Sequence, residues 1–162
     1  YYGLMIDISH PSKEAIAQMI ELSVAPVIAS HSSARALRDH PRNLDDEQLN
    51  LVRDNGGVIQ VTALGSFLTD RKDPPPNMDD FMDHIDYMVQ KIGINHVGIS
   101  SDFDGGGGIV GWNDASETMN VTDALRERGY SDSEIEKLWG GNLLRVLDEV
   151  QAIAAKLQSQ EL

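Results

Sequence analysis

Four short apolar runs, each followed by a stretch of helical periodicity, constrain the fold of this chain more than any other feature. Such runs are typical of buried strands in α/β proteins, where consecutive βα units pack as a parallel sheet with right-handed crossovers. The predicted strands are residues 4–8, 27–29, 58–64 and 97–101. An open doubly wound sheet and half of a (β/α)8 barrel both fit this pattern, and periodicity alone does not separate them. No linker interrupts the pattern, so no second domain is needed.

Capping residues predict where the helices begin. A polar side chain just before an apolar stripe accepts a hydrogen bond from a first-turn N–H group and stabilises the start of a helix. The predicted caps are Ser12, either Asn43 or Asp45, Asn77, Ser131 in a capping box with Glu134, and Asn142. Between the third strand and Asn77, the loop at residues 65–76 is long enough to have a function.

Charge and composition exclude some classes of function. Lys plus Arg at 13 against Asp plus Glu at 26 give a net charge of −13, which repels phosphate backbones, so nucleic acid is not expected as a partner. The absence of cysteine excludes thiolate metal sites but fits either redox compartment, so periplasmic, secreted and cytoplasmic locations stay open. No targeting or membrane-spanning run is visible. Because the chain starts directly in a strand-like segment without an initiator methionine, we expect a piece of a longer chain.

Ionisable side chains follow three of the predicted strands. His10 and His31 come at the ends of the first two strands, and Asp102 follows the fourth. The carboxyl ends of parallel strands meet at one edge of a sheet, which brings these side chains together. Imidazole and carboxylate suit zinc or a similar divalent ion, and the lack of cysteine favours a hydrolytic site. One histidine alone is more often a core or capping residue, so the metal-site hypothesis depends on the three positions jointly.

Several motifs then resemble one known family over almost the whole chain. They are DISHPS at 7–12, PVIASHSSA at 26–34, HPRN at 40–43, NGGVIQV at 55–61, VGISSDFDG at 97–105 and GGNLLRVLDEV at 140–150. In order and spacing they are similar to the membrane (renal) dipeptidase family of zinc peptidases in the amidohydrolase superfamily. The resemblance implies a (β/α)8 TIM barrel of the metal-dependent hydrolase type. Residues 1–162 would be its C-terminal half, with about four βα units that correspond to strands five to eight.

The resemblance also implies roles for individual residues. His10 and His31 match the two histidines that ligate one metal of a binuclear zinc site. Arg42 matches the arginine that holds the terminal carboxylate of a dipeptide substrate, and Asp102 matches the aspartate that moves a proton between a metal-bridged hydroxide and the departing amine. A planar guanidinium and a carboxylate beside metal-bound water suit these tasks. The alternatives are a surface ion-pair arginine and a helix-capping aspartate.

Other ligands of the family are absent from this sequence. Its first-strand His-x-Asp pair, bridging glutamate and further substrate-binding histidine would lie upstream of Tyr1, so the isolated chain would hold half a site and be inactive. We expect such a piece to form a homo-oligomer or to pair with its missing N-terminal half, because a cut barrel exposes sheet edges and apolar helix flanks. Alternatives are a related metal-dependent amidohydrolase acting on another small amide or ester, and a noncatalytic relative or fragment.

The remaining histidines and acidic residues are predicted to be structural. His40 would shape the arginine loop, His84 would lie within an amphipathic helix, and His96 would precede a strand at the opposite face of the barrel. Asp104 would hold the glycine-rich loop through backbone amides, and Asp7 would support His10 or pack near it. The four glycines at 105–108 are not a phosphate-binding loop, since no Lys-Ser/Thr pair follows them.

Overall fold

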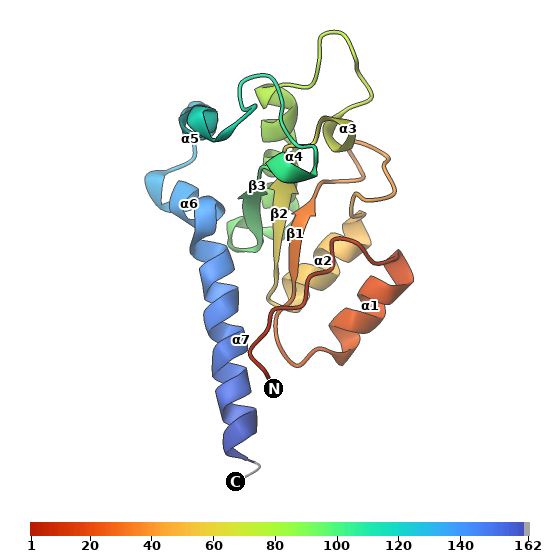
Figure 1. Cartoon of the computed structure of the whole chain (residues 1–162), viewed down its shortest axis with the longest axis vertical. Helices are drawn as coiled ribbons and strands as arrows, with labels where there is room; N and C mark the ends of the chain where they lie inside the picture. Colours follow the sequence, from red (N-terminus) through yellow and green to blue (C-terminus); the bar gives the residue numbers. More distant parts are fainter. Residues whose placement is uncertain (161–162) are drawn as a thin grey trace.

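The computed structural model describes residues 1–160 and is built on a three-stranded parallel sheet. The strands lie in the order β1 (Ile28–Ser32), β2 (Val58–Thr62) and β3 (Val97–Ser100), as Figure 1 shows. Helices connect consecutive strands, which confirms the predicted α/β class and its parallel βα units.

The helices begin close to the predicted capping residues. They are α1 (Lys13–Leu22), α2 (Asp46–Asp54), α3 (Gly65–Leu68), α4 (Met78–Ile92), α5 (Thr118–Glu127), α6 (Asp132–Glu136) and α7 (Asn142–Ser159), and a π-helical turn at Lys137–Gly141 joins α6 to α7. Asp45, rather than Asn43, caps α2 in a capping box. Ser12, Asn77 and Ser131 cap α1, α4 and α6 as predicted.

The predicted cap at Asn142 is wrong. The chain enters α7 through the preceding π-helical turn, so no helix start with free N–H groups exists at this point. The buried Asn142 side chain instead donates hydrogen bonds to the carbonyl oxygens of Ile94 at 2.7 Å and Val97 at 2.8 Å. It therefore ties α7 to the start of β3.

The predicted strand at residues 4–8 is reduced to one bridge. Asp7 pairs with Ile28 in parallel, with hydrogen bonds from Ile8 N to Ile28 O at 2.8 Å and from Ile28 N to Ile6 O at 2.9 Å. Leu4, before this bridge, is 78% exposed. The segment thus lies beside β1 as an edge held by few hydrogen bonds, too short to count as a strand.

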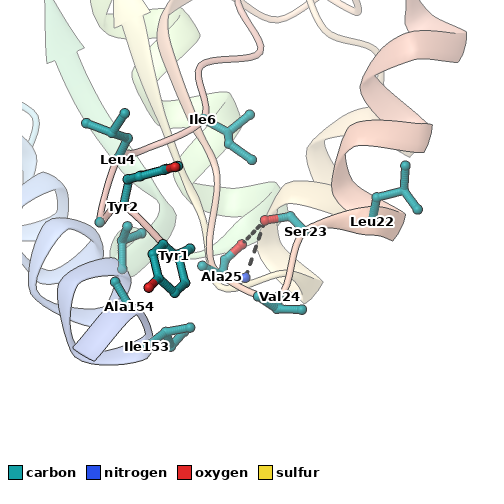
Figure 2. A pocket seen from close by; sticks show the side chains of 12 residues that line it. Tyr1, Tyr2, Leu4, Ile6, Leu22, Ser23, Val24, Ala25, Ile153 and Ala154 are labelled. Carbon is teal, nitrogen blue, oxygen red and sulfur yellow. Dashed lines mark hydrogen bonds between the residues drawn. The ribbon is translucent and has the colours of Figure 1, made fainter. Parts of the chain in front are cut away.

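The exposed edge borders an apolar groove near the two termini. Figure 2 shows Tyr1, Leu4 and Ile6 of the first segment together with Leu22 at the end of α1, Val24 in the turn after it and Ile153 of α7. The groove holds about 270 Å³, and Leu22 is 81% exposed. Contiguous exposed patches of large apolar side chains are typical of interaction surfaces.

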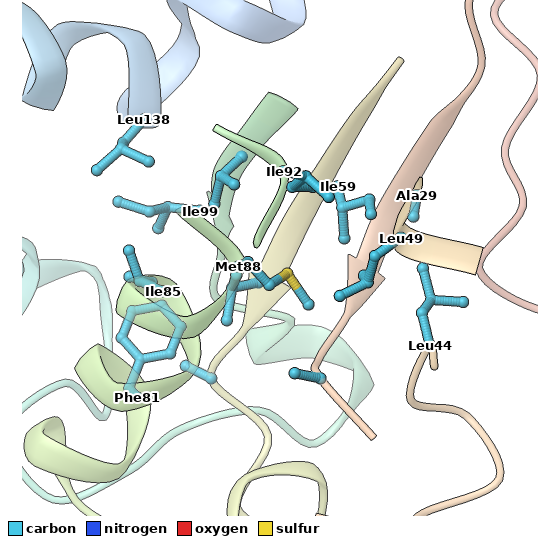
Figure 3. Close-up of a cluster of buried hydrophobic side chains, with 14 of the residues drawn as sticks. Ala29, Leu44, Leu49, Ile59, Phe81, Ile85, Met88, Ile92, Ile99 and Leu138 are labelled. Carbon is cyan, nitrogen blue, oxygen red and sulfur yellow. The ribbon is translucent and has the colours of Figure 1, made fainter. Parts of the chain in front are cut away.

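The main core lies between α4 and one face of the sheet. Figure 3 shows Phe81, Ile85 and Met88 of α4 directed toward Ile59 of β2 and Ile99 of β3. These side chains are almost fully buried. On the other face, a smaller apolar cluster joins the strands to α7, and it consists of Ile28, Val58, Val146 and Val150. The core therefore fixes the strands and leaves their carboxyl ends free for polar side chains.

Hydropathy adds one further finding about the helices. Within residues 1–160, no helix combines the length and the apolar character that crossing a membrane requires.

Candidate active site

A cavity of about 310 Å³ opens at the carboxyl ends of the strands. Its lining includes all four residues that the sequence proposed for the site, and consists of His10, His31, Arg42, Leu64, Phe67, Asp102, Asp104 and Gly105. These residues come from segments as far apart as the first and fourth predicted strands. The βα topology brings them together because every strand of a parallel sheet ends at the same edge.

The two histidines direct their Nε2 atoms at each other. The distance from His10 Nε2 to His31 Nε2 is 3.0 Å, and the ring centroids are 4.9 Å apart. Two imidazole nitrogens that bind one tetrahedral zinc ion at about 2.0–2.1 Å lie about 3.4 Å from each other. The pair therefore has the donor type that a shared zinc or similar divalent ion needs, and its two nitrogens lie at a hydrogen-bond distance, about 0.4 Å closer than such an ion would hold them.

The described residues do not complete a metal site. Residues 1–160 contain no cluster of three or more His, Cys, Asp or Glu side chains placed to bind one ion. Asp102 shares the cavity with the histidines but does not form such a cluster with them. A tetrahedral site needs further ligands beyond these two imidazoles.

Arg42 reaches into the same cavity from the loop after β1. Its Nε donates to the carbonyl oxygen of Ser9 at 3.0 Å, and its Nη2 lies 3.2 Å from His31 Nε2. The guanidinium also lies over the Phe67 ring, 5.7 Å from the ring centroid. Among residues 1–160 Arg42 makes no ion pair, so the surface ion-pair alternative does not apply to this conformation.

His40 shapes the loop that carries Arg42, as expected. Its Nδ1 accepts a hydrogen bond from the Arg42 backbone N–H at 3.2 Å, and its ring lies 4.4 Å from that of Phe67. Burial, with the positive charges of Arg38, Arg42 and Arg35, lowers the pKa of His40 below its usual value. The neutral ring can therefore act as an acceptor in the loop.

Asp102 follows β3 by two residues and lies in the left-handed region of backbone conformation, with φ of 53°. Aspartate tolerates this conformation better than most residues, and such strain is common at functional sites. The Asp102 carbonyl oxygen accepts from Gly105 N at 3.0 Å and Gly107 N at 2.7 Å. A Cβ atom on Gly107 would lie 1.9 Å from the Ser101 carbonyl oxygen, so the glycines permit a close approach of backbone.

The expected role of Asp104 is therefore wrong. The Asp102 carbonyl group holds the glycine-rich loop, whereas Asp104 lines the cavity and makes no hydrogen bond to a backbone amide within residues 1–160. The short 3₁₀ turn at Phe103–Gly105 directs the backbone amides of the loop back toward the end of β3.

Asp7 makes no hydrogen bond to the His10 side chain within residues 1–160 and bonds instead to Ser9, the residue directly before it. Its carboxylate accepts hydrogen bonds from the backbone and the hydroxyl of both Ser9 and Ser30. Burial alone would raise the pKa of Asp7, but these four donors outweigh it and hold the pKa below its usual value. Ser30 Oγ in turn lies 2.8 Å from His31 Nδ1, so Asp7 is linked to the second histidine through Ser30.

Sequence reasoning missed Phe67 and Ser30. Phe67 belongs to the short helix α3, and its ring contacts both Arg42 and His40 of the neighbouring loop. The sequence offered one signal for Phe67, which is its position in the long loop predicted after the third strand. Ser30 directly precedes His31 in β1, and its contact with Asp7 depends on a pairing between segments that are not adjacent in sequence.

Comparison with known proteins identifies the family. The sequence profile of the membrane dipeptidases, peptidase family M19, matches residues 1–161. The chain belongs to this family. It is 38% identical over 154 residues to dipeptidase tcpJ of Claviceps purpurea and 39% identical over 160 residues to dipeptidase ataJ of Aspergillus terreus. These matches cover 94% and 98% of the chain but only 36% and 39% of the two relatives.

Solved structures of membrane dipeptidases have the same fold. The probable dipeptidase PvdM from Pseudomonas aeruginosa superposes with a TM-score of 0.90 at 39% identity, over 93% of this chain and 51% of that one. A metallo peptidase from Rhodobacter sphaeroides, liganded with a phosphinate mimic of the dipeptide L-Ala-D-Ala, gives a TM-score of 0.83 at 31% identity. This match covers 91% of the present chain and 43% of the metallo peptidase. The chain therefore covers part of a metallopeptidase fold, and the family implies a metal cofactor.

Proposed function

We propose that this chain is the C-terminal half of a single (β/α)8 domain that hydrolyses the amide bond of dipeptides with zinc. Membership of the dipeptidase family supports the reaction class, and the partial coverage of every relative described above supports the split of the domain. By itself the chain would hold two metal ligands of a binuclear site and would be inactive.

In this proposal His10 and His31 bind one zinc ion through their Nε2 atoms. Zinc supplies a Lewis acid for the scissile carbonyl group and lowers the pKa of bound water to about 7. Arg42 holds the terminal carboxylate of the dipeptide with two parallel hydrogen bonds. Asp102 accepts a proton at its carboxylate oxygen and returns it to the departing amine.

One observation carries the proposal: two Nε2 atoms converge at 3.0 Å in a cavity that Arg42 and Asp102 also line. A structural histidine pair does not need a guanidinium without an ion-pair partner beside it. A cationic anchor a few ångströms from a metal site suits a substrate that has one carboxylate and one scissile amide, because both ends are then held in a fixed orientation.

The test of the metal site is zinc content in the complete gene product that contains this chain. We expect about two zinc ions per complete chain, as a binuclear site requires. His31→Gln should lose at least one of them, whereas the control His96→Gln should lose none, because His96 bonds the Gly57 carbonyl away from the cavity. Absence of zinc together with absence of hydrolysis across a dipeptide panel, including one with a D-residue, would refute the proposal.

The test of substrate anchoring uses Arg42→Ala. Losing hydrogen bonds to a charged group costs about 1.5–3 kcal/mol, so kcat/KM for dipeptides should fall about 10- to 100-fold. A dipeptide amide, which lacks the carboxylate, should show no such fall. Arg38→Ala is the matched control, because Arg38 in the same loop pairs with Asp70 instead. A related amidohydrolase acting on substrates without a carboxylate would be indifferent to Arg42→Ala.

We also propose that the missing half of the domain covers the apolar groove beside residues 4–8. The chain spans 36% and 39% of two curated relatives, and Leu4 and Leu22 are largely exposed. In sedimentation, the chain alone should self-associate and should form a one-to-one complex when the upstream half is added. A chain that stays monomeric in both conditions would contradict this pairing, and a stable homodimer that ignores the upstream half would assign the groove to a second copy.

A further inference from the structure

We propose that Asp7 and Ser30 form a hydrogen-bonded relay that fixes the tautomer and ring orientation of His31, so that its Nε2 lone pair is directed into the cavity. Both are positioning residues that act through His31 and do not touch the substrate. The inference deepens the proposed function, on which it rests for the presence of zinc.

The direction of each hydrogen bond in the relay follows from donor and acceptor counts. An ionised carboxylate only accepts, so the Ser30 hydroxyl must donate its single proton to Asp7 Oδ2. Ser30 Oγ is then left as an acceptor toward His31 Nδ1, 2.8 Å away. His31 therefore carries its proton on Nδ1, and its Nε2 keeps a lone pair.

An independent contact at the other end of the ring agrees with this tautomer. Arg42 Nη2 lies 3.2 Å from His31 Nε2, and a guanidinium has donors but no acceptor. It can approach the ring nitrogen favourably only if that nitrogen bears a lone pair. Two neighbours on opposite sides of His31 thus require the same tautomer, which is the one a metal ligand needs.

Asp7 also fixes the backbone before both histidines. Its Oδ1 accepts from Ser9 N at 3.0 Å and from Ser30 N at 3.0 Å, and these residues directly precede His10 and His31. The Ser9 hydroxyl donates to the same oxygen at 2.8 Å and accepts from His31 N at 3.1 Å. One carboxylate therefore sets the spacing between the two segments that carry the ligands.

His10 provides an internal comparison. Within residues 1–160, its Nδ1 has no hydrogen-bond partner, whereas its Nε2 lies 3.0 Å from that of His31 and, since His31 Nε2 keeps a lone pair, donates a hydrogen bond to it in the metal-free protein. A relay of this kind thus acts on one of the two imidazoles only. Groups that orient a metal-ligating histidine typically change metal affinity by 10- to 100-fold.

The first experiment reads the tautomer directly in the metal-free complete protein. Selective ¹⁵N-histidine labelling and long-range ¹H–¹⁵N correlation at about pH 8.5, where imidazole is ordinarily neutral, distinguish a protonated from an unprotonated ring nitrogen. We expect His31 to be protonated at Nδ1 only. Ser30→Ala should give a mixture of tautomers, and Ser30→Thr, which keeps the hydroxyl, should restore the single tautomer. An Nε2-protonated His31 in the wild type, or no response to Ser30→Ala, would overturn the relay.

The second experiment separates the relay from the proposed function. Zinc affinity, measured by chelator competition on the complete protein, should fall about 10- to 100-fold in Ser30→Ala and stay near the wild-type value in Ser30→Thr. Equal zinc affinity in all three proteins would overturn the positioning role. If the wild type shows the expected tautomer but binds no zinc, the relay's hydrogen bonding stands, while the proposed function and the relay's role toward zinc both fail.

Discussion

Replacing His84 with leucine should destabilise the fold by about 2–6 kcal/mol. His84 of α4 is 1% exposed; its Nδ1 accepts from Ala34 N at 3.1 Å, and its Nε2 lies 3.1 Å from the Leu68 carbonyl oxygen, to which it donates. Leucine makes neither bond. Each lost bond contributes about 0.5–1.5 kcal/mol, and the buried N–H of Ala34 left without a partner adds about 1–3 kcal/mol.

The same histidine should make stability depend on pH. Burial lowers the pKa of His84, while the hydrogen bond to Leu68 and the nearby aspartates Asp83 and Asp80 offset part of this effect. The unfolded chain therefore takes up the proton first as pH falls. This contribution to stability is fully present above about pH 6.5 and is lost below it, at up to about 1.4 kcal/mol per pH unit, until the folded pKa is reached.

Urea unfolding followed by circular dichroism at pH 7.5, 6.5 and 5.5 tests both statements. His84→Leu should be less stable at pH 7.5 and should show a shallower fall toward pH 5.5. Some dependence of stability on pH should remain in His84→Leu, because the pKa of His40 is also below its usual value. His96→Leu is the control, since His96 is only half-buried and makes one hydrogen bond. A loss below 1 kcal/mol for His84→Leu at pH 7.5, or an unchanged slope, would refute the reasoning.

Three further substitutions test other parts of the structure. Gly107→Ala should destabilise the protein and lower the activity of the complete enzyme, because the alanine Cβ would collide with the backbone of Ser101 and Asp102. A variant with the thermal stability of the wild type would contradict this close approach of the backbone. Asn142→Leu should lower the free energy of urea unfolding by about 2–3 kcal/mol, because the carbonyl groups of Ile94 and Val97 lose their hydrogen bonds from Asn142. An unchanged free energy of unfolding would contradict the role of Asn142 in joining α7 to the start of β3. Asn77→Ala should cost about 1 kcal/mol as a lost cap of α4, whereas Asn77→Ser should cost much less.

Local signals in the sequence predicted most of the helices. Ser12, Asn77 and Ser131 precede helices in the structure because a cap needs only its own side chain and the next few N–H groups. Asn142 looked the same in sequence, but the chain was already helical before it, and its side chain found distant carbonyl groups instead. A capping signal therefore predicts correctly where the chain enters a helix from an extended conformation.

The cavity was predictable in its chemistry but not in its hydrogen bonds. His10, His31 and Asp102 end predicted strands, and parallel pairing places strand ends together, so their meeting in one cavity follows from the order of elements. The link from Asp7 to Ser30 follows from the register between the first segment and β1. No pattern within either segment encodes that register.

The sequence by itself determined the βα order, most of the helix starts, the acidic balance and the type of side chain at each strand end, because each depends on residues close together in the chain. Tertiary structure alone decided that residues 4–8 form a bridge instead of a strand, that Asp7 bonds to Ser30 beside His31, and that Asp102 adopts a positive φ. These features depend on which backbone groups find partners across the fold, and such partners are set by packing between distant segments.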